Sequence, residues 1–266
     1  MEFLKAILLG LVQGFTEFLP VSSSGHLVLF GYFLGFEQEL SFEIFVHLGT
    51  LIAVLIYFRK DLFNLIKSII YFKDASYKGG RKMIMWLFVA TVVTGIIGIV
   101  CKDMFKVLFD SPLFVACMLA ITGTILYFSD KIGMKRTTHA GLNMKKSLFI
   151  GLGQAIAITP GISRSGTTIV FALLTGLKRE HAARFSFLLS IPAILGATLL
   201  DYRAVERLDS TQLIIYIIGF VTAFISGYFV IKWFMKLIVK AKLRYFAYYC
   251  WAVAVVSIVL ILTIRS

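Results

Sequence analysis

Two residues near the start of the chain suggest acid–base chemistry inside an apolar segment. Gln13 and Glu17 are four positions apart, so they share one face of a helix. A carboxylate in such a segment is costly, and it usually faces a cavity or a partner. We therefore interpret Glu17 as a functional group. A purely structural hydrogen bond or ion pair is the alternative.

Three consecutive serines follow the carboxylate. Ser22, Ser23 and Ser24 precede Gly25 and an apolar stretch that starts at His26. They would place hydroxyls and free backbone N–H groups at a helix N-terminus, which favours an anion such as phosphate. Simple N-capping by one serine is the alternative, and it can hold for Ser22 while Ser23 or Ser24 points at a ligand. His26, one turn inside, could be a general acid, a general base or a phosphate donor.

A second segment, residues 160–168, has a similar composition and reads Pro-Gly-Ile-Ser-Arg-Ser-Gly-Thr-Thr. Its hydroxyls and a glycine would again surround a helix N-terminus: Ser163, Ser165, Gly166 and Thr168. Arg164 adds a guanidinium, the side chain best suited to bidentate phosphate binding. The alternative for Arg164 is a buried pair with Glu17, and both interpretations can hold in the empty protein.

Other chemical motifs are missing from the sequence. Residues 161–165 lack the final glycine of a nucleophile elbow, and there is no P-loop, dinucleotide fingerprint or zinc-type cluster. The Ser-Gly-His and Ser-Arg pieces resemble membrane phosphatases with a later nucleophilic histidine, but Val170 stands at that position. His47, His139 and His181 have no convergent partners in the sequence, and we interpret the aromatic run 245–251 as an interfacial belt.

The composition identifies an integral membrane protein. Of the 266 residues 59% are hydrophobic and 15% charged, with a mean hydropathy of +0.90, whereas soluble domains are about 45–50% apolar and about 25% charged. The three cysteines are predicted to be small buried side chains: Cys101, Cys117 and Cys250. The first residues lack a cleavage site, so we expect the N-terminus to be retained.

Six apolar stretches are long enough to cross a bilayer as helices: 42–58, 82–101, 112–128, 184–200, 212–231 and 245–264. Four shorter stretches are bounded by Pro, Gly and Ser clusters: 3–19, 26–35, 145–159 and 167–177. Backbone that breaks a helix at membrane depth is tolerated only around a buried or wet site. We therefore predict an all-α polytopic membrane protein with six transmembrane helices and two re-entrant hairpins, 3–35 and 145–177.

The basic residues predict the orientation and explain the net charge of +13 without a nucleic-acid partner. Twenty of the 27 lysines and arginines lie in four connections: 59–82, 129–146, 178–184 and 232–244. Only six lie in the opposite connections and the two tails, which places both termini outside by the positive-inside rule.

An internal repeat at an offset of 141 relates the two hairpins. Six residues, Gly10, Leu11, Gln13, Ser22, Ser24 and Gly25, recur as Gly151, Leu152, Gln154, Ser163, Ser165 and Gly166. Three spans, an odd number, follow each copy, so the second copy must be inverted. We expect one membrane domain of two repeats, 1–128 and 145–264, whose hairpin tips face each other near the midplane.

These motifs together resemble the undecaprenyl-diphosphate phosphatases, the bacitracin resistance family of bacterial membranes. The resemblance covers nearly the whole chain. It rests on Gln/Glu-x3-Glu and Pro-Val-Ser-Ser-Ser-Gly-His at 13–26, Pro-Gly-Ile-Ser-Arg-Ser-Gly-x-Thr at 160–168 and Phe-Ser-Phe-Leu-Leu-Ser-x-Pro at 185–192. It implies hydrolysis of undecaprenyl diphosphate to the monophosphate, with the site open to the extracytoplasmic side of the plasma membrane. This reaction recycles the lipid carrier of peptidoglycan synthesis, and bacitracin competes by sequestering the substrate.

The resemblance also implies residue roles. Ser23 corresponds to the proposed nucleophile, His26 to the histidine, Glu17 to the carboxylate and Arg164 to the phosphate-binding arginine. The other polar residues of the tips are expected to bind substrate phosphate: Gln13, Ser22, Ser24, Gly25, Ser163, Ser165, Gly166 and Thr168.

Several points of the mechanism stay open at this stage. A divalent cation, Mg²⁺ or Ca²⁺, is implied by the resemblance, with Glu17 as a ligand. Gln13 occupies a position where the family can have Glu, which weakens any role that needs a charge there. The base is His26 or Glu17, and the nucleophile is Ser23, a neighbouring serine or water. A lipid-phosphate flippase or secondary transporter of the same architecture is the competing function.

Overall fold

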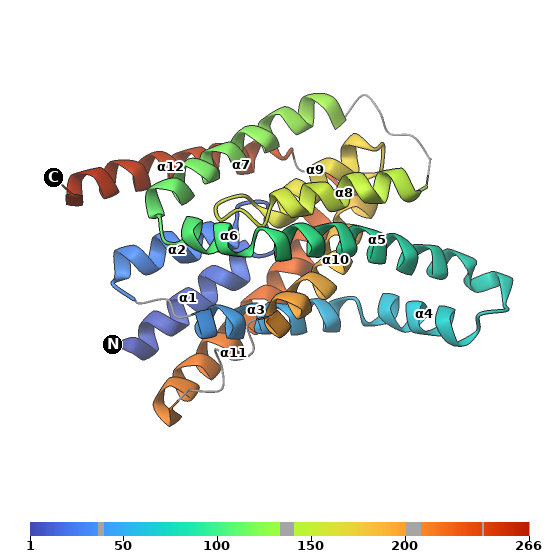
Figure 1. The fold of residues 1–266 in the computed structure, drawn as a ribbon, viewed down its shortest axis with the longest axis horizontal. Helices are drawn as coiled ribbons and strands as arrows, with labels where there is room; N and C mark the ends of the chain where they lie inside the picture. The colour runs from blue at the N-terminus through green and yellow to red at the C-terminus, as the bar shows by residue number, and fades with distance from the viewer. Residues whose placement is uncertain (37–39, 134–140, 201–208, 241, 266) are drawn as a thin grey trace.

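The computed structural model describes residues 1–36, 40–133, 141–200, 209–240 and 242–265. All regular secondary structure within these residues is helical, and the helices run roughly lengthwise through an elongated molecule (Figure 1). Five helices are individually long and apolar enough to cross a membrane, or up to six when one bent pair forms a single span. The prediction of an all-α polytopic membrane protein is therefore confirmed.

Six longer helices correspond to the predicted spans: α3 (Leu40–Tyr57), α5 (Lys78–Val100), α7 (Pro112–Gly133), α10 (Arg179–Leu200), α11 (Ser210–Leu237) and α12 (Arg244–Arg265). Three further elements lie in stretches that we expected to be connections: α4 (Arg59–Ile70), the 3₁₀ helix η1 (Ala75–Tyr77) and α6 (Lys102–Phe109). The helix α4 was missed because charged residues interrupt its apolar positions, as is usual for an amphipathic helix. It is bent by 74° from α3.

Four short helices form the two broken pairs. The helix α1 (Glu2–Thr16) packs on α2 (Ser23–Leu34), and α8 (Met144–Ile156) packs on α9 (Arg164–Leu174). The breaks fall at the Pro and Ser clusters because proline has no N–H for a helix interior, while Ser22 and Gly161 have φ angles of 67° and 90°. The predicted helical segments of 3–35 and 145–177 are thus present, whereas their re-entry into a membrane stays a prediction.

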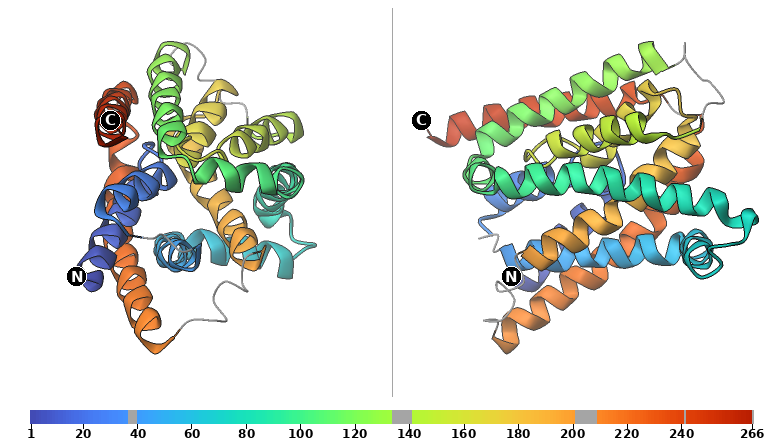
Figure 2. Two further views of the ribbon diagram at one scale, coloured as in Figure 1. Left: turned by 60° about the vertical axis from the view of Figure 1, so that its left-hand side comes forward. Right: turned by 45° about the vertical axis from the view of Figure 1, so that its right-hand side comes forward.

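Glycines at repeat-related positions allow each broken pair to pack closely against a longer helix. A Cβ atom on Gly10 would lie 2.6 Å from the carbonyl oxygen of Gly219 in α11, and one on Gly151 would lie 2.8 Å from that of Ala90 in α5. Because glycine has no Cβ, the helix backbones can approach closely at these positions, which is a common basis of helix packing in membranes. The further views in Figure 2 show α11 running beside α1, and α12 beside α7.

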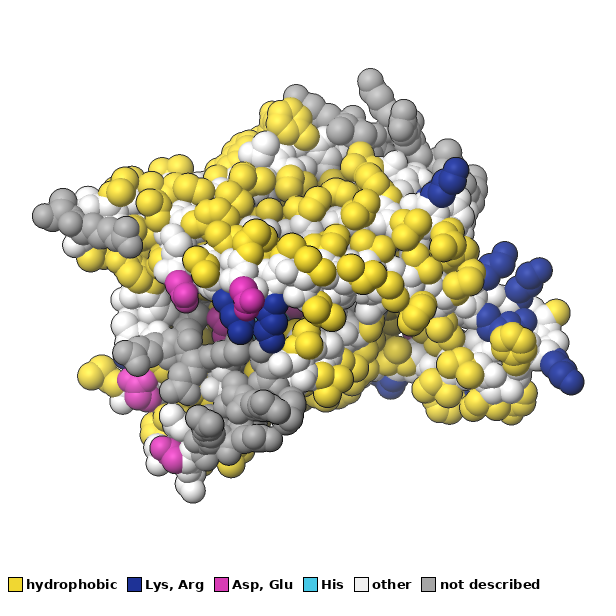
Figure 3. Space-filling model, in the orientation of Figure 1, with side chains coloured by type: hydrophobic (Ala, Val, Ile, Leu, Met, Phe, Trp, Pro, Cys, Tyr) yellow, Lys and Arg dark blue, Asp and Glu magenta, His cyan; other side chains and the backbone are white. Residues whose placement is uncertain are grey.

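The surface matches a membrane environment. Hydrophobic side chains cover most of the face shown in Figure 3, and a group of lysines and arginines lies at the end formed by α4 and the start of α5. Both termini lie toward the opposite end (Figure 1). This separation fits the predicted orientation, while the side of the membrane that each end faces stays a prediction, as does the division into repeats 1–128 and 145–264.

The cysteines differ from the sequence-based expectation. All three are free thiols, but only Cys250 is buried, whereas Cys101 is half-buried and Cys117 is exposed on α7. The prediction of three buried side chains was wrong for Cys117. Exposure of an apolar side chain toward lipid has little cost, so burial rules derived from water-soluble proteins fail on this face.

The turn at Gly161 provides a test of the hairpin geometry. Gly161→Ala should lower the free energy of unfolding by more than about 2 kcal/mol, because alanine disfavours the left-handed backbone and its Cβ would overlap the Val115 carbonyl oxygen. Thermal unfolding in detergent measures the loss. Gly196→Ala is the matched control, because no atom lies within 4 Å of the added Cβ. Equal stability of the two variants would contradict the described turn.

Candidate functional site

The carboxylate of Glu17 lies where the two broken helix pairs meet. Its residue is 5% exposed, just after α1. Arg164, the first residue of α9, donates a hydrogen bond to Oε1. The Ser23 hydroxyl donates to Oε2 at 2.5 Å, and the Gln13 side-chain amide donates to Oε2 at 3.1 Å. The carboxylate therefore joins the predicted serine to the predicted arginine, which is 147 positions away from Glu17 in the sequence.

The helix α3 contributes two residues that sequence analysis did not assign to the site. His47 Nε2 lies 3.8 Å from Glu17 Oε2, and Thr50, one turn later, accepts a hydrogen bond of 3.4 Å from Gln13. The other His47 nitrogen, Nδ1, is 2.8 Å from the Glu43 carbonyl oxygen, so Nδ1 carries the proton in a neutral ring. The expectation that His47 lacks a convergent partner was wrong, because no local spacing reveals the packing of α3 on α1. His139 lies outside the described residues.

His26 is held away from the carboxylate by its own partners. Nδ1 lies 2.8 Å from the Ser22 carbonyl oxygen, and Nε2 lies 2.9 Å from the Tyr249 hydroxyl, in a ring only 3° from the plane of Tyr249. The His26 residue is 1% exposed. Both ring nitrogens are thus engaged, and Glu17 rather than His26 contacts the Ser23 hydroxyl. Tyr249, which we had placed in an interfacial belt, has this additional role.

Matching serines cap the two helices that start at the site. The Ser22 hydroxyl accepts from the Gly25 N–H at 3.2 Å, and the Ser163 hydroxyl accepts from the Gly166 N–H at 3.1 Å. A Cβ atom on Gly25 would lie 3.1 Å from the Cα of Gly161, so the two tips are in direct contact. The capping interpretation therefore holds for Ser22 and applies to Ser163 as well.

Two predicted phosphate ligands bond to protein groups instead. The Ser165 hydroxyl donates to the Leu19 carbonyl at 2.9 Å, and the Thr168 hydroxyl lies 2.5 Å from that of Ser186. Ser165 and Thr168 are both buried. They fix the geometry of the tip, and their predicted contact with phosphate is untested.

Three groups remain open to a ligand. Ser23 and Ser24 are half-buried and begin α2. Nη1 of Arg164 is buried and has no hydrogen-bond partner among the described residues. The first N–H groups of α2 and α9 add further donors, because the N-terminal turn of a helix leaves them without intrahelical acceptors. The site can therefore surround an anion with a hydroxyl, a guanidinium and two helix N-termini.

The site offers few protein ligands for a divalent cation, but they are oxygen atoms, which Mg²⁺ and Ca²⁺ prefer. Among the residues that the structure describes, no group of three or more His, Cys, Asp or Glu side chains could hold a metal ion. Glu17 supplies one carboxylate, and the buried Gln13 Oε1 has no hydrogen-bond partner in the described parts of the chain. Such a pair fits a cation held mainly by substrate phosphates, as Mg²⁺ often is.

This fold and site define an integral membrane protein in which two serine-capped helix N-termini meet at a buried carboxylate. The chain belongs to the family described as bacitracin resistance protein BacA, whose model matches residues 6–256. The resemblance inferred from the motifs is confirmed.

Three relatives, each named undecaprenyl-diphosphatase, are similar over nearly their whole length. The protein from Methanobrevibacter smithii is 44% identical over 96% of both chains. The protein from Methanosphaera stadtmanae is 42% identical over 98% of both chains, and that from Halothermothrix orenii is 44% identical over 98% of both chains.

Stability measurements can test the Glu17–Arg164 pair. Glu17→Gln or Arg164→Gln alone should lower the free energy of unfolding by about 3–5 kcal/mol, because each leaves a charge or its donors buried without the partner. The double variant should lose less than the sum of the single losses by at least about 1 kcal/mol. Thermal unfolding of all four proteins in detergent gives this comparison. Additive losses would contradict a direct interaction.

Proposed function

We propose that this chain hydrolyses undecaprenyl diphosphate to undecaprenyl phosphate and inorganic phosphate within the membrane. The observation that carries the proposal is the hydrogen bond of 2.5 Å from the Ser23 hydroxyl to Glu17. A hydroxyl becomes an effective nucleophile when a neighbouring base takes its proton. The names of the relatives give independent support for the substrate.

The first chemical step forms a bond from Ser23 Oγ to the terminal phosphorus. Glu17 takes the hydroxyl proton, and the anhydride P–O bond breaks so that undecaprenyl phosphate leaves with the electron pair. Arg164 and the N–H groups at the start of α2 and α9 hold the phosphoryl oxygens, where charge accumulates in the transition state. Water then attacks the phosphoserine, which releases inorganic phosphate and regenerates Ser23.

Arg164 links phosphate binding to this proton transfer. In the described structure its guanidinium bonds to Glu17, while Nη1 stays unpartnered. A phosphate that draws the guanidinium toward itself leaves Glu17 with fewer donors and therefore freer to accept the Ser23 proton. His26 acts as a positioning residue in this mechanism, because its ring holds the Ser22 carbonyl at the start of α2.

The surroundings of the reaction complete the proposal. The site opens to the extracytoplasmic side of the plasma membrane. This orientation is supported by the connections 59–82, 129–146, 178–184 and 232–244, which hold 20 of the 27 basic residues and would therefore face the cytoplasm. Bacitracin competes by binding the same lipid diphosphate. Mg²⁺ or Ca²⁺ would bind the diphosphate together with oxygens of Glu17 and Gln13, and it would neutralise charge on the leaving phosphate.

A carrier or flippase with the same architecture is the less favoured function. Such a protein needs an anion site at broken helices, which Arg164 and the helix N-termini would satisfy. It does not need a hydroxyl at hydrogen-bonding distance from a buried carboxylate. The Ser23–Glu17 contact therefore favours hydrolysis over transport.

Phosphate release by the purified protein tests the activity and the nucleophile. Wild type should release phosphate from a long-chain prenyl diphosphate in detergent, and Arg164→Ala should not. Ser23→Ala should lower turnover by about 10³-fold or more while the substrate still binds, because only the attacking group is removed. Ser24→Ala is the matched control and should lose less than about tenfold. Normal turnover in Ser23→Ala would move the attack to water, and a folded but inactive wild type would contradict the enzyme.

Cation dependence tests the proposed metal ligands. EDTA should remove phosphate release, and Mg²⁺ or Ca²⁺ should restore it. Gln13→Glu should lower the cation concentration for half-maximal rate by about tenfold, because a second carboxylate would face the diphosphate. The control is Gln154→Glu, at the repeat-related position, where the side-chain amide donates to Thr94 as that of Gln13 does to Thr50, but not to Glu17. A rate insensitive to EDTA, or equal shifts in both variants, would contradict the cation site.

A further inference from the structure

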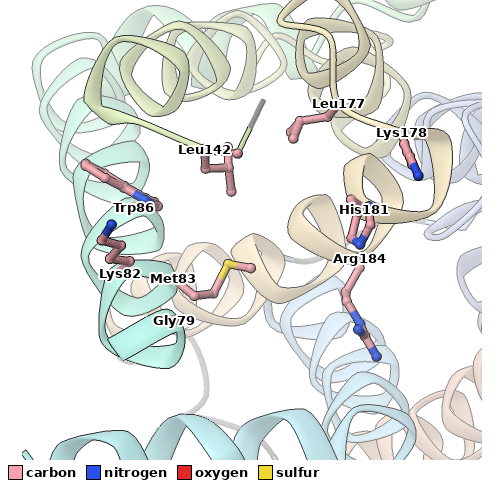
Figure 4. A pocket seen from close by; sticks show the side chains of 10 residues that line it. Gly79, Lys82, Met83, Trp86, Leu142, Leu177, Lys178, His181 and Arg184 are labelled. Carbon is pink, nitrogen blue, oxygen red and sulfur yellow. The ribbon is translucent and has the colours of Figure 1, made fainter. Parts of the chain in front are cut away.

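A pocket lies between the N-terminal halves of α5 and α10, apart from the residues proposed for catalysis. It has a volume of about 430 Å³. Figure 4 shows Lys82, Met83 and Trp86 on one wall, from α5, and basic side chains of α10 on the other. Leu142 and Leu177 close one side. None of the residues proposed for phosphate hydrolysis lines it.

The charge of this pocket is positive. Lys82, Lys178, His181 and Arg184 all line it, and the described residues of its lining include no Asp or Glu. Arg184 is partly neutralised by Asp61, 3.2 Å away at the start of α4. Lys82 and Lys178 are exposed and add two further positive charges beside the pocket. A concave surface lined by one sign of charge concentrates ligands of the opposite sign.

The apolar wall of the pocket and the adjacent helix α4 have the composition expected at a lipid–water boundary. The helix α4 has strongly exposed apolar side chains, including Phe63 and Ile70 at 62% and 68%, between charged positions. Lys67 lies over the Phe63 ring at 5.2 Å. This arrangement is typical of a helix in the membrane interface, with its apolar face in lipid and its cations among headgroups. The Asp61–Arg184 ion pair connects α4 to the pocket wall.

We propose that this pocket binds the phosphate headgroup of an anionic phospholipid. Lys82, Lys178 and His181 would contact the phosphate, while Trp86 and Met83 would contact the start of the acyl chains. Basic pockets between transmembrane helices favour such headgroups. This site is distinct from the catalytic one, because the two lie at opposite ends of α9. Arg164 begins this helix, and Lys178 follows its C-terminal end. The helix has 11 residues and is therefore about 16 Å long.

Trp86 provides a direct reporter of occupancy. The chain has three tryptophans, so a variant with Trp233→Phe and Trp251→Phe retains Trp86 as its single tryptophan. In detergent, phosphatidylglycerol with brominated acyl chains should quench its fluorescence at about tenfold lower concentration than brominated phosphatidylcholine. Adding Lys82→Gln and Lys178→Gln should remove this preference.

A charge-matched control separates the pocket from the general positive charge of this end. Lys60→Gln with Lys73→Gln removes two exposed lysines outside the lining and should retain the preference. Equal loss in both double variants would overturn a specific site, as would equal quenching by the two lipids in the parent. If inorganic phosphate displaces the brominated lipid in the millimolar range, the pocket binds a soluble anion and the lipid assignment is wrong. Near-identical thermal stability of the variants confirms that each is folded.

Discussion

The structure depends on one buried carboxylate that two distant segments share. Glu17 follows α1, and its oxygens accept hydrogen bonds from Ser23 in the same broken pair and from Arg164 in the other. An uncompensated charge at this depth would be strongly unfavourable, so each group needs the others to stay buried. The same requirement brings a hydroxyl, a base and a guanidinium together. The contact between the two tips and the proposed phosphate chemistry therefore depend on the same three side chains.

The backbone around this carboxylate is arranged to leave donors at its centre. Ser22 and Ser163 cap α2 and α9 with equivalent hydrogen bonds, and the glycines at the tips allow the two turns to touch. Each cap satisfies one N–H group and leaves earlier ones available, because a helix start has more donors than a single serine can bond. Buried hydroxyls that bond to carbonyls, such as Ser165, hold this geometry without needing to contact a ligand.

The two ends of α9 differ in their surroundings. Its first residue, Arg164, is paired with a carboxylate among buried polar groups, whereas the residues after its last turn border a pocket rich in lysine. The cations beside that pocket are mostly exposed and lie near an amphipathic helix. The chain thus combines a buried ion pair between two helix N-termini in the interior with exposed positive charge beside the pocket. The physical difference lies in burial, which makes the interior pair costly to separate and leaves the outer lysines free to exchange partners.

The sequence alone determined the membrane class, the broken helices and the identity of Glu17, Ser23 and Arg164 as a candidate set. The membrane class, the broken helices, Glu17 and Arg164 follow from hydropathy, helix-breaking residues and the cost of charge in an apolar segment, which are local properties. Ser23 was distinguished from its neighbouring serines by the family resemblance. The sequence could not show which of His26 and Glu17 contacts the Ser23 hydroxyl, and it gave no sign of His47, Thr50 or Tyr249 as neighbours of these residues. Those answers depend on α3 and α12 packing beside the tips, where contacts join positions between 30 and 223 residues apart. Only the tertiary structure decides them, because side-chain proximity across helices is set by packing and leaves no periodic signal in the chain.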